Sequence, residues 1–177
     1  MKAPKKKGPV AHIDSTMPLH LKFGPTVVPP LPPVRCFRQQ LSEAAQNYLW
    51  SVQESRSYAP RTRIFAMGED PEGIFLIESG EVSLWLERNS TYPLLLRTAS
   101  SGEVLGLSAC VSGHTYEATA IAVSPCEVAF IPADKLARMV ERFPESAIAI
   151  SEFLNSQLNA AYDHVMSMRS ARCEHKQ

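Results

Sequence analysis

The stretch that decides the fold is GEVLGLSAC at residues 102–110, followed after a short gap by YEATA at residues 116–120. Gly102 and Gly106 stand four residues apart, a spacing that predicts a turn leading into a short helix. The later run has the composition of a strand. Backbone N–H groups at the start of the short helix, in residues 106–109, can bind an anion. The segment therefore predicts a cradle for a small ligand within a β-rich domain.

Short apolar runs separated by glycine or proline extend from this segment in both directions. Val82, Leu84 and Leu86 alternate with other side chains, which is the period of a half-buried strand. Ser79-Gly80 just before them predicts a tight hairpin. The sequence predicts strands at Arg61–Phe65, Ile74–Glu78, Glu81–Glu87, Leu94–Thr98, Ala118–Val123 and Glu127–Ile131. Strands this short and closely spaced are typical of a small barrel or jelly roll.

Apolar residues recur at helical spacing on either side of the strands. Residues 36–54 form one such stretch, and Ser42 fits the cap of a segment within it. Residues 133–143 form a second helix, for which Asp134 is the predicted cap. From Ala147 onward, spacings of three and four predict a long amphipathic helix that dimerises along a heptad-like seam. The seam residues are Ile150, Leu154, Leu158, Ala161, Val165 and Met168.

The predicted fold class is α+β: a double-stranded β-helix, or jelly-roll β-barrel, flanked by helices and followed by a long C-terminal dimerisation helix. We divide the chain into a Pro-rich, basic arm at residues 1–33, the β-roll with its flanking helices at 34–143, the dimerisation helix at 144–170 and a tail at 171–177. The arm holds eight of the 14 prolines, so we expect it to be disordered.

Charge and cysteine usage exclude several classes of function. Residues 1–33 carry a net charge of +4 and residues 34–177 carry −4, and an acidic body is a poor electrostatic match for DNA. The four cysteines stand far apart with no C-x-x-C pair, so we predict no metal site and a reducing, cytoplasmic setting. No apolar run reaches the roughly 18 residues of a membrane span, and no signal peptide is visible.

Four motifs in order resemble the cyclic-nucleotide-binding domain of Crp/Fnr-type bacterial regulators. They are IFAMGE at 64–69, IESGEV at 77–82, GEVLG at 102–106 and CEVAFI at 126–131. The resemblance covers about residues 38–170 and implies the β-roll, a phosphate-binding cassette around residues 102–120, a homodimer, and regulation by a small-molecule effector. It also implies a C-terminal helix-turn-helix domain, for which residues 169–177 are too short, so we expect no sequence-specific DNA binding by this chain.

The residues that hold the nucleotide in that family are replaced in this sequence. Leu107 stands where cAMP-binding members carry a glutamate for the ribose, and Tyr116 stands where an arginine clamps the cyclic phosphate. Glu117 replaces a common serine or threonine, and the adenine-contacting positions fall at about Ala161 and Tyr162. Loss of one buried charge partner costs about 2–5 kcal/mol, a factor of roughly 30 to several thousand in affinity. We therefore predict weak or absent binding of cAMP and cGMP.

Two interpretations of the altered cassette remain open. Either Tyr116 fills the space left by the arginine and Glu117 faces solvent, or the pocket is reworked for a different ligand, with Val111 as part of its apolar wall. The ligand-binding residues are then Gly106, Leu107, Ser108, Ala109, Tyr116, Glu117 and Thr119. His114 also lies in the cassette, but a lone loop histidine is more often exposed than a haem ligand, so no haem is predicted.

We weighed three functions for a chain of this kind. The favoured one is a non-catalytic sensor module of Crp/Fnr type, with no catalytic residues and no membrane association. The alternative is a dimerising interaction protein with a vestigial pocket, a partner or antagonist of a related regulator. The third, an enzyme of the cupin type, needs a His/Glu metal cluster on adjacent strands, and the predicted strands carry no histidine.

Overall fold

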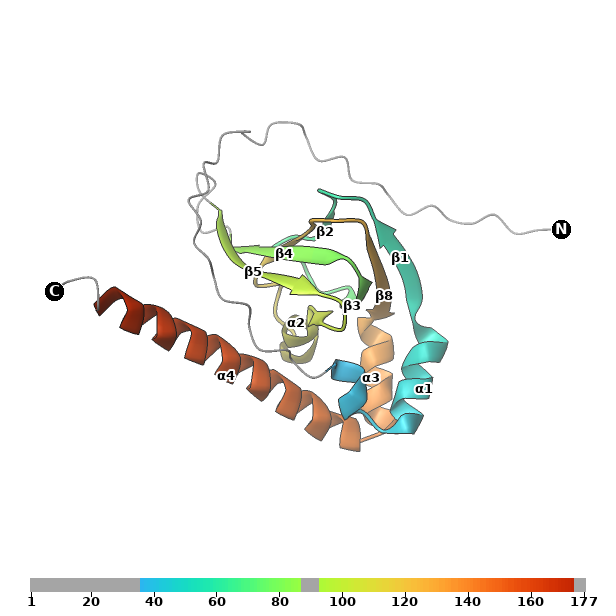
Figure 1. The fold of residues 1–177 in the computed structure, drawn as a ribbon. Helices are drawn as coiled ribbons and strands as arrows, with labels where there is room; N and C mark the ends of the chain where they lie inside the picture. Colours follow the sequence, from blue (N-terminus) through green and yellow to red (C-terminus); the bar gives the residue numbers. More distant parts are fainter. Residues whose placement is uncertain (1–35, 87–92, 174–177) are drawn as a thin grey trace.

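The computed structural model describes residues 36–86 and 93–173, and there two four-stranded antiparallel sheets lie above a group of helices (Figure 1). This arrangement confirms the predicted fold class, a β-roll flanked by helices with a long helix at its C-terminal end. The arm predicted at residues 1–33 lies outside the described residues.

The first sheet has the strand order β1-β8-β3-β6. Its central strands are buried, and all of residues 73–77 in β3 lie in the interior. Such a continuous run is expected for a strand covered on both faces, here by the second sheet and by the helices. The strands are β1 (Glu54–Tyr58), β8 (Cys126–Pro132), β3 (Gly73–Ser79) and β6 (Val104–Leu105).

The second sheet has the order β2-β7-β4-β5, which leaves β5 at an edge. Its strands are β2 (Arg63–Phe65), β7 (Thr119–Ala122), β4 (Glu81–Leu86) and β5 (Leu94–Ser100). Gly80, with a φ of 90°, makes the turn that joins β3 to β4. The two strands belong to different sheets and do not pair with each other, so the tight hairpin predicted at Ser79-Gly80 is wrong. The alternation along β4 is less complete than the sequence suggests, because Ser83 is also buried and donates a hydrogen bond to the carbonyl of Ile121.

The N-terminal helices occupy the stretch predicted as helical, except at its end. η1 (Phe37–Gln40) is a short 3-10 helix, and α1 (Glu43–Val52) follows it. Ser42 caps α1 as predicted, because its Oγ accepts a hydrogen bond from Ala45 N at 3.4 Å. Glu54, included in the predicted helical stretch, begins β1 instead.

Helix α3 (Ala133–Arg142) starts two residues earlier than a cap at Asp134 would allow. Pro132 occupies the N-cap position, and Asp134 lies inside the first turn, so the prediction that Asp134 caps this helix is wrong. Its carboxylate still lies near the positive end of the helix, where an acidic side chain is stabilising.

Two layers of core hold the fold together. The outer layer joins the helices to the first sheet and includes Phe37, Leu49 and Met139, while the inner layer lies between the two sheets and includes Phe75 and Val128. Successive residues of β3 point into opposite layers, because side chains alternate across a strand. The first sheet therefore packs against the helices on one face and against the second sheet on its other face.

Helix α4 (Glu145–Cys173) begins in the outer core layer and then runs past α2 (Leu107–Ser112) and beyond the β-roll (Figure 1). Ile150 is only 3% exposed and belongs to this core, as does Phe153, whose ring centroid lies 5.3 Å from that of Phe37. Ile150 is therefore buried within its own chain and is not available to a partner, so its predicted place in the dimer seam is wrong.

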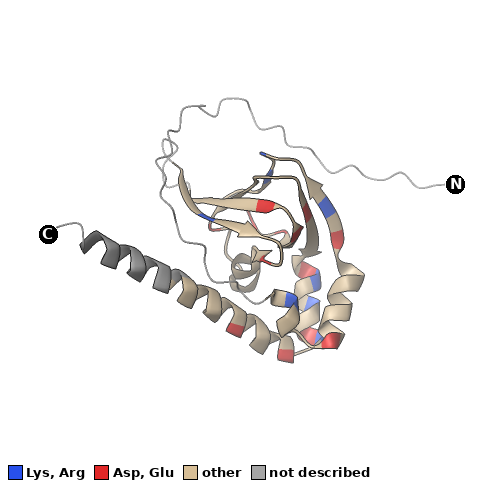
Figure 2. Ribbon diagram, viewed as in Figure 1, with Lys and Arg blue, Asp and Glu red and all other residues tan. Residues whose placement is uncertain are grey.

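The predicted seam residues after Ile150 differ in their exposure. Leu154 is half-buried and packs against the outer core layer, whereas Leu158 is 67% exposed. The side chains of the other predicted seam residues, Ala161, Val165 and Met168, lie outside the described residues. Figure 2 shows few charges along the described part of α4, where Glu145 and Glu152 stand as acidic residues. Among the described helices, none has the length and hydrophobicity of a bilayer span.

Candidate functional site

The glycine segment forms a strand, a left-handed turn and a short helix. After β6, Gly106 has a φ of 79°, a left-handed conformation that favours glycine, and α2 starts at the next residue. A Cβ at Gly106 would lie 2.9 Å from Cε1 of Tyr116 and 3.1 Å from the carbonyl oxygen of Gly73. The glycine is therefore required both by backbone conformation and by the close approach of Tyr116.

Tyr116 lies inside the β-roll, with 3% of its surface exposed. Its ring stacks on Phe65 with a centroid distance of 4.1 Å, and its hydroxyl donates a hydrogen bond to the carbonyl of Gly73 at 2.9 Å. Burial raises the pKa of Tyr116 to about 12, so its phenol is neutral at physiological pH. At the position predicted from the sequence to correspond to the family's arginine, this chain has a neutral, hydrogen-bonded ring.

The other predicted ligand-binding residues divide into buried and exposed sets. Leu107, Ala109 and Thr119 are buried, and Thr119 Oγ1 accepts a hydrogen bond from Met67 N at 3.0 Å. Ser108 and Glu117 are exposed. The buried ring of Tyr116 and the exposed side chain of Glu117 agree with the interpretation that Tyr116 fills the space of the arginine and Glu117 faces solvent. The other interpretation, a pocket reworked for a different ligand, stays open because a cavity lies beside them.

A pocket of about 210 Å³ opens between the second sheet, the cassette and α4. Nine of its 14 lining residues are apolar or glycine, and five carry polar side chains. Its lining includes six of the seven predicted ligand-binding residues, the exception being Thr119. The lining residues are Phe65, Leu84, Leu96, Arg97, Val104, Leu105, Gly106, Leu107, Ser108, Ala109, Tyr116, Glu117, Ala118 and Gln157.

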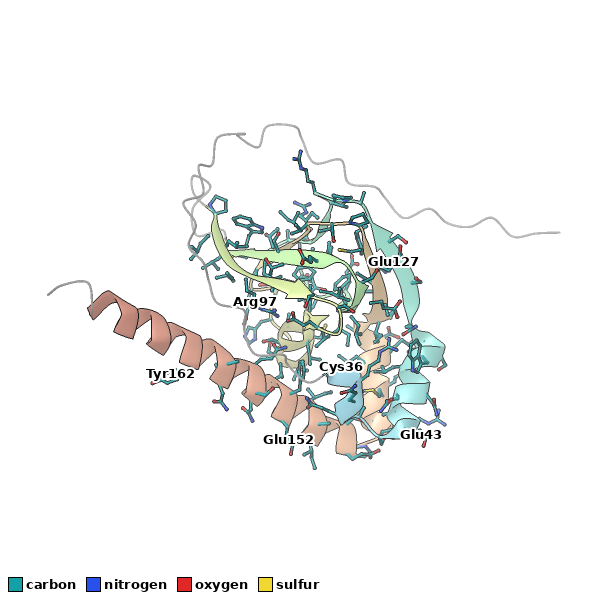
Figure 3. The ribbon with its side chains drawn as sticks, in the orientation of Figure 1. Cys36, Glu43, Arg97, Glu127, Glu152 and Tyr162 are labelled. Carbon is teal, nitrogen blue, oxygen red and sulfur yellow. The ribbon has the colours of Figure 1, made fainter. Side chains whose placement is uncertain are left out.

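Arg97, which is labelled in Figure 3, is the basic side chain in this lining. It is already paired with Glu103. Its guanidinium donates to the carboxylate of Glu103, and the other carboxylate oxygen of Glu103 accepts a hydrogen bond from Ser100 N at 2.8 Å. Both partners are largely shielded from solvent, so the pair is screened less than a surface pair. The charged side chains of the described lining are therefore the carboxylate of Glu117 and the guanidinium of Arg97, whose positive charge is balanced by Glu103.

Eight of the 14 lining residues were not predicted as ligand-binding from the sequence, and the polar ones among them are Arg97 and Gln157. The adenine-contacting positions were placed at Ala161 and Tyr162, but Tyr162 is 63% exposed and is absent from the lining, where α4 contributes Gln157 instead. The Nε2 of Gln157 is shielded from solvent and has no hydrogen-bond partner in the described part of the chain. No signal in the sequence singles out Gln157, because its neighbours on α4 include the uncharged polar residues Asn155, Ser156 and Asn159.

Metal and haem chemistry gain no support at this site. Within residues 36–86 and 93–173, no three His, Cys, Asp or Glu side chains are placed to hold a metal ion. His114 is exposed in the loop after α2 and does not line the pocket.

Cys110 on α2 is expected to react slowly with alkylating reagents. Burial raises its pKa from 9.0 to about 11, so the thiolate fraction near pH 8 falls about a hundredfold. Timed alkylation with iodoacetamide, followed by mass spectrometry of the peptide that contains Cys110, measures this rate in folded and urea-unfolded protein. The rate in the folded protein should rise as the pH approaches 11. Equal rates in the two states at pH 8 would contradict the burial of this thiol.

Comparison with known proteins gives a family and a fold. The family model described as the cyclic nucleotide-binding domain matches residues 55–143. No curated protein sequence matches the chain significantly. Among solved structures, the Thermus thermophilus catabolite activator protein aligns with a TM-score of 0.65 and 22% identity, over 76% of this chain and 62% of that protein.

Two further structures align over a similar part of the chain. The c-di-GMP responsive global regulator CLP of Xanthomonas campestris has a TM-score of 0.62 and 22% identity, over 73% of this chain and 63% of that protein. The sensor domain of the transcriptional regulator DNR of Pseudomonas aeruginosa has a TM-score of 0.62 and 18% identity, over 73% of this chain and 87% of that domain. This chain thus spans less than two thirds of the two longer regulators and most of the isolated sensor domain.

Proposed function

This chain belongs to the cyclic nucleotide-binding domain family, and we propose that it is a non-catalytic, cytoplasmic sensor module that responds to a small effector other than a cyclic nucleotide. The observation that carries the proposal is the position of α4. Gln157 of this helix lines the pocket, while the next residue, Leu158, is exposed on its outer side. An effector in the pocket therefore contacts the same helix turn that a partner would contact.

The proposed output is a change in how two copies of α4 meet. Leu154 and Leu158, with the sequence positions Ala161, Val165 and Met168, form what we call the outer stripe of α4. This stripe continues the apolar periodicity after Ile150 has entered the core, and the helix around it carries few charges. An apolar stripe at heptad-like spacing favours a parallel helix pair, and interfaces of this kind can have two discrete packings.

Cyclic nucleotides are expected to bind poorly because the pocket offers no cation for the phosphate. Tyr116 occupies the position of the clamp with a neutral phenol, and Arg97 is paired with Glu103. Titration calorimetry with cAMP and with cGMP should give dissociation constants weaker than about 10 μM. A tighter constant for either nucleotide would contradict this part of the proposal.

The variant Glu117→Gln is the matched control for this titration. It removes the one exposed carboxylate of the described pocket lining without changing the size of the side chain. Because that carboxylate is exposed, its repulsion of a phosphate is screened, and the affinity for cAMP should improve by no more than about fivefold.

The second candidate is a dimerising interaction protein whose pocket is vestigial. It is favoured by the burial of Leu107, Tyr116 and Thr119, which serve the core of the roll rather than a free binding surface. A thermal-shift screen over nucleotides, haem, small anions and neutral compounds separates the two candidates. A ligand at 100 times its dissociation constant stabilises the folded state by about 2.7 kcal/mol, and a screen without any shift would favour the interaction protein.

A further inference from the structure

We propose that the pocket binds a small, uncharged molecule with a flat apolar body and a hydrogen-bond acceptor, which the amide of Gln157 recognises. This inference rests on the proposed sensor function and specifies the chemical class of its effector. It follows from three features of the pocket: an unpaired donor, the sign of its charges, and its size.

The unpaired donor is the Nε2 group of Gln157. This nitrogen is shielded from solvent and has no partner among the described residues, although the residue lines the pocket. A buried N–H group without an acceptor is unfavourable, so most buried polar groups in folded proteins are paired. A ligand carbonyl or ring nitrogen in the pocket would supply the missing acceptor once the amide of Gln157 turns toward it, a side-chain movement that leaves the backbone of α4 in place.

The charges of the lining disfavour an anionic ligand. The guanidinium of Arg97 is held by Glu103, whose carboxylate is itself fixed by Ser100 N, so releasing Arg97 would leave a shielded carboxylate without its partner. Glu117 adds a further negative charge at the exposed side of the lining. An anion entering the pocket would meet this charge and find no uncommitted cation among the described lining residues.

The size and walls of the pocket select a compact apolar body. Its volume of about 210 Å³ is below the roughly 300–1,000 Å³ of typical small-molecule pockets and corresponds to about seven water molecules. Phe65, Leu84, Leu96 and Leu107 line it from four different elements. A single ring with one polar substituent fits within this volume, whereas a molecule the size of a nucleotide would extend out of the open side of the pocket.

The pair benzamide and benzoate tests this inference directly, because the two molecules have nearly the same shape and differ by one charge. Titration of the full chain, followed by the NMR shifts of its backbone amides, gives both dissociation constants. Benzamide should bind with a constant on the order of 1 mM, as expected for a ligand of this size, and at least about tenfold more tightly than benzoate. Equal or tighter binding of benzoate, or no binding of either probe, would overturn the inference.

Variants of α4 test the role of Gln157. Gln157→Leu removes the donor and should weaken benzamide at least about fivefold, while Asn159→Leu, an exposed position two residues away, should leave its binding unchanged. Removing an unpaired buried amide should also raise the melting temperature of the free protein by about 3 °C. Should Gln157→Leu fail to fold, Gln157→Asn retains an amide but withdraws it by one methylene group. Unchanged benzamide binding in the folded variant contradicts the assignment.

The binding experiments and the measurement of the dimer test the ligand inference and the proposed sensor function separately. Preference for benzoate would show that the pocket takes anions, and a sensor with an anionic effector would still stand. Absence of a dimer, measured independently of any probe, would count against the sensor proposal without deciding which ligand the pocket prefers.

Discussion

Replacing Tyr116 by alanine should lower the free energy of unfolding by about 3–5 kcal/mol, as large aromatic truncations in cores do. The ring stacks on Phe65 and contacts the inner core layer, and the void left by its removal lies beside Gly106, whose left-handed backbone cannot move to fill it. Urea denaturation followed by tryptophan fluorescence measures the change. A loss below about 1 kcal/mol would show that Tyr116 is not a core residue.

Tyr116→Phe is the matched control because it retains the ring and removes only the hydroxyl. This hydroxyl donates to the carbonyl of Gly73 at 2.9 Å in a buried setting. Its loss should cost about 1–2 kcal/mol, clearly less than the alanine variant. If the two variants were equally destabilised, the hydrogen bond rather than the stacked ring would dominate, which the packing around Phe65 does not predict.

Replacing Leu158 by aspartate should convert the proposed dimer to a monomer. Burial of one leucine contributes about 1.5–3 kcal/mol, and a two-fold interface loses this contribution twice. The dimer dissociation constant should therefore rise by at least a hundredfold, before the cost of burying two like charges is added. Leu158 is 67% exposed within one chain, so the fold of the monomer should be unaffected.

Light scattering coupled to size exclusion at about 10 μM measures the mass of each form. Ile148→Asp is the matched control, because Ile148 is 65% exposed on the same helix and lies about 80° around its axis from Leu158. That variant should remain dimeric. A dimer that survives Leu158→Asp would place the interface elsewhere, and a wild-type monomer would contradict dimerisation through α4.

Strands with an apolar alternation or a continuous apolar run could be predicted from the sequence, and those without could not. β3 and β8 are apolar along most of their length and were expected near their observed positions. β1 has the sequence ESRSY, in which polar residues predominate, and it is defined by its pairing with β8 rather than by its own composition. β6 has two residues and exists through its pairing with β3.

For both the dimer seam and the pocket, local sequence spacing could not predict which side chains from distant parts of the chain come into contact. A spacing of three and four identifies one apolar face of α4, but it cannot divide that face between the chain's own core and a partner. Ile150 enters the core because Phe37 and Met139 come to lie beside it from distant parts of the chain. Arg97 and Gln157 were missed because neither belongs to a local motif, and they meet the cassette only through packing.

The sequence by itself determined the β-roll and the backbone of the cassette, because glycines at left-handed turns and alternating apolar residues act over a few neighbouring positions. Only the tertiary structure decided that Tyr116 lies inside the roll, that Arg97 is neutralised by Glu103 and that Gln157 faces the pocket. These outcomes depend on which distant side chains come together and on the burial that results, and neither is encoded in local spacing.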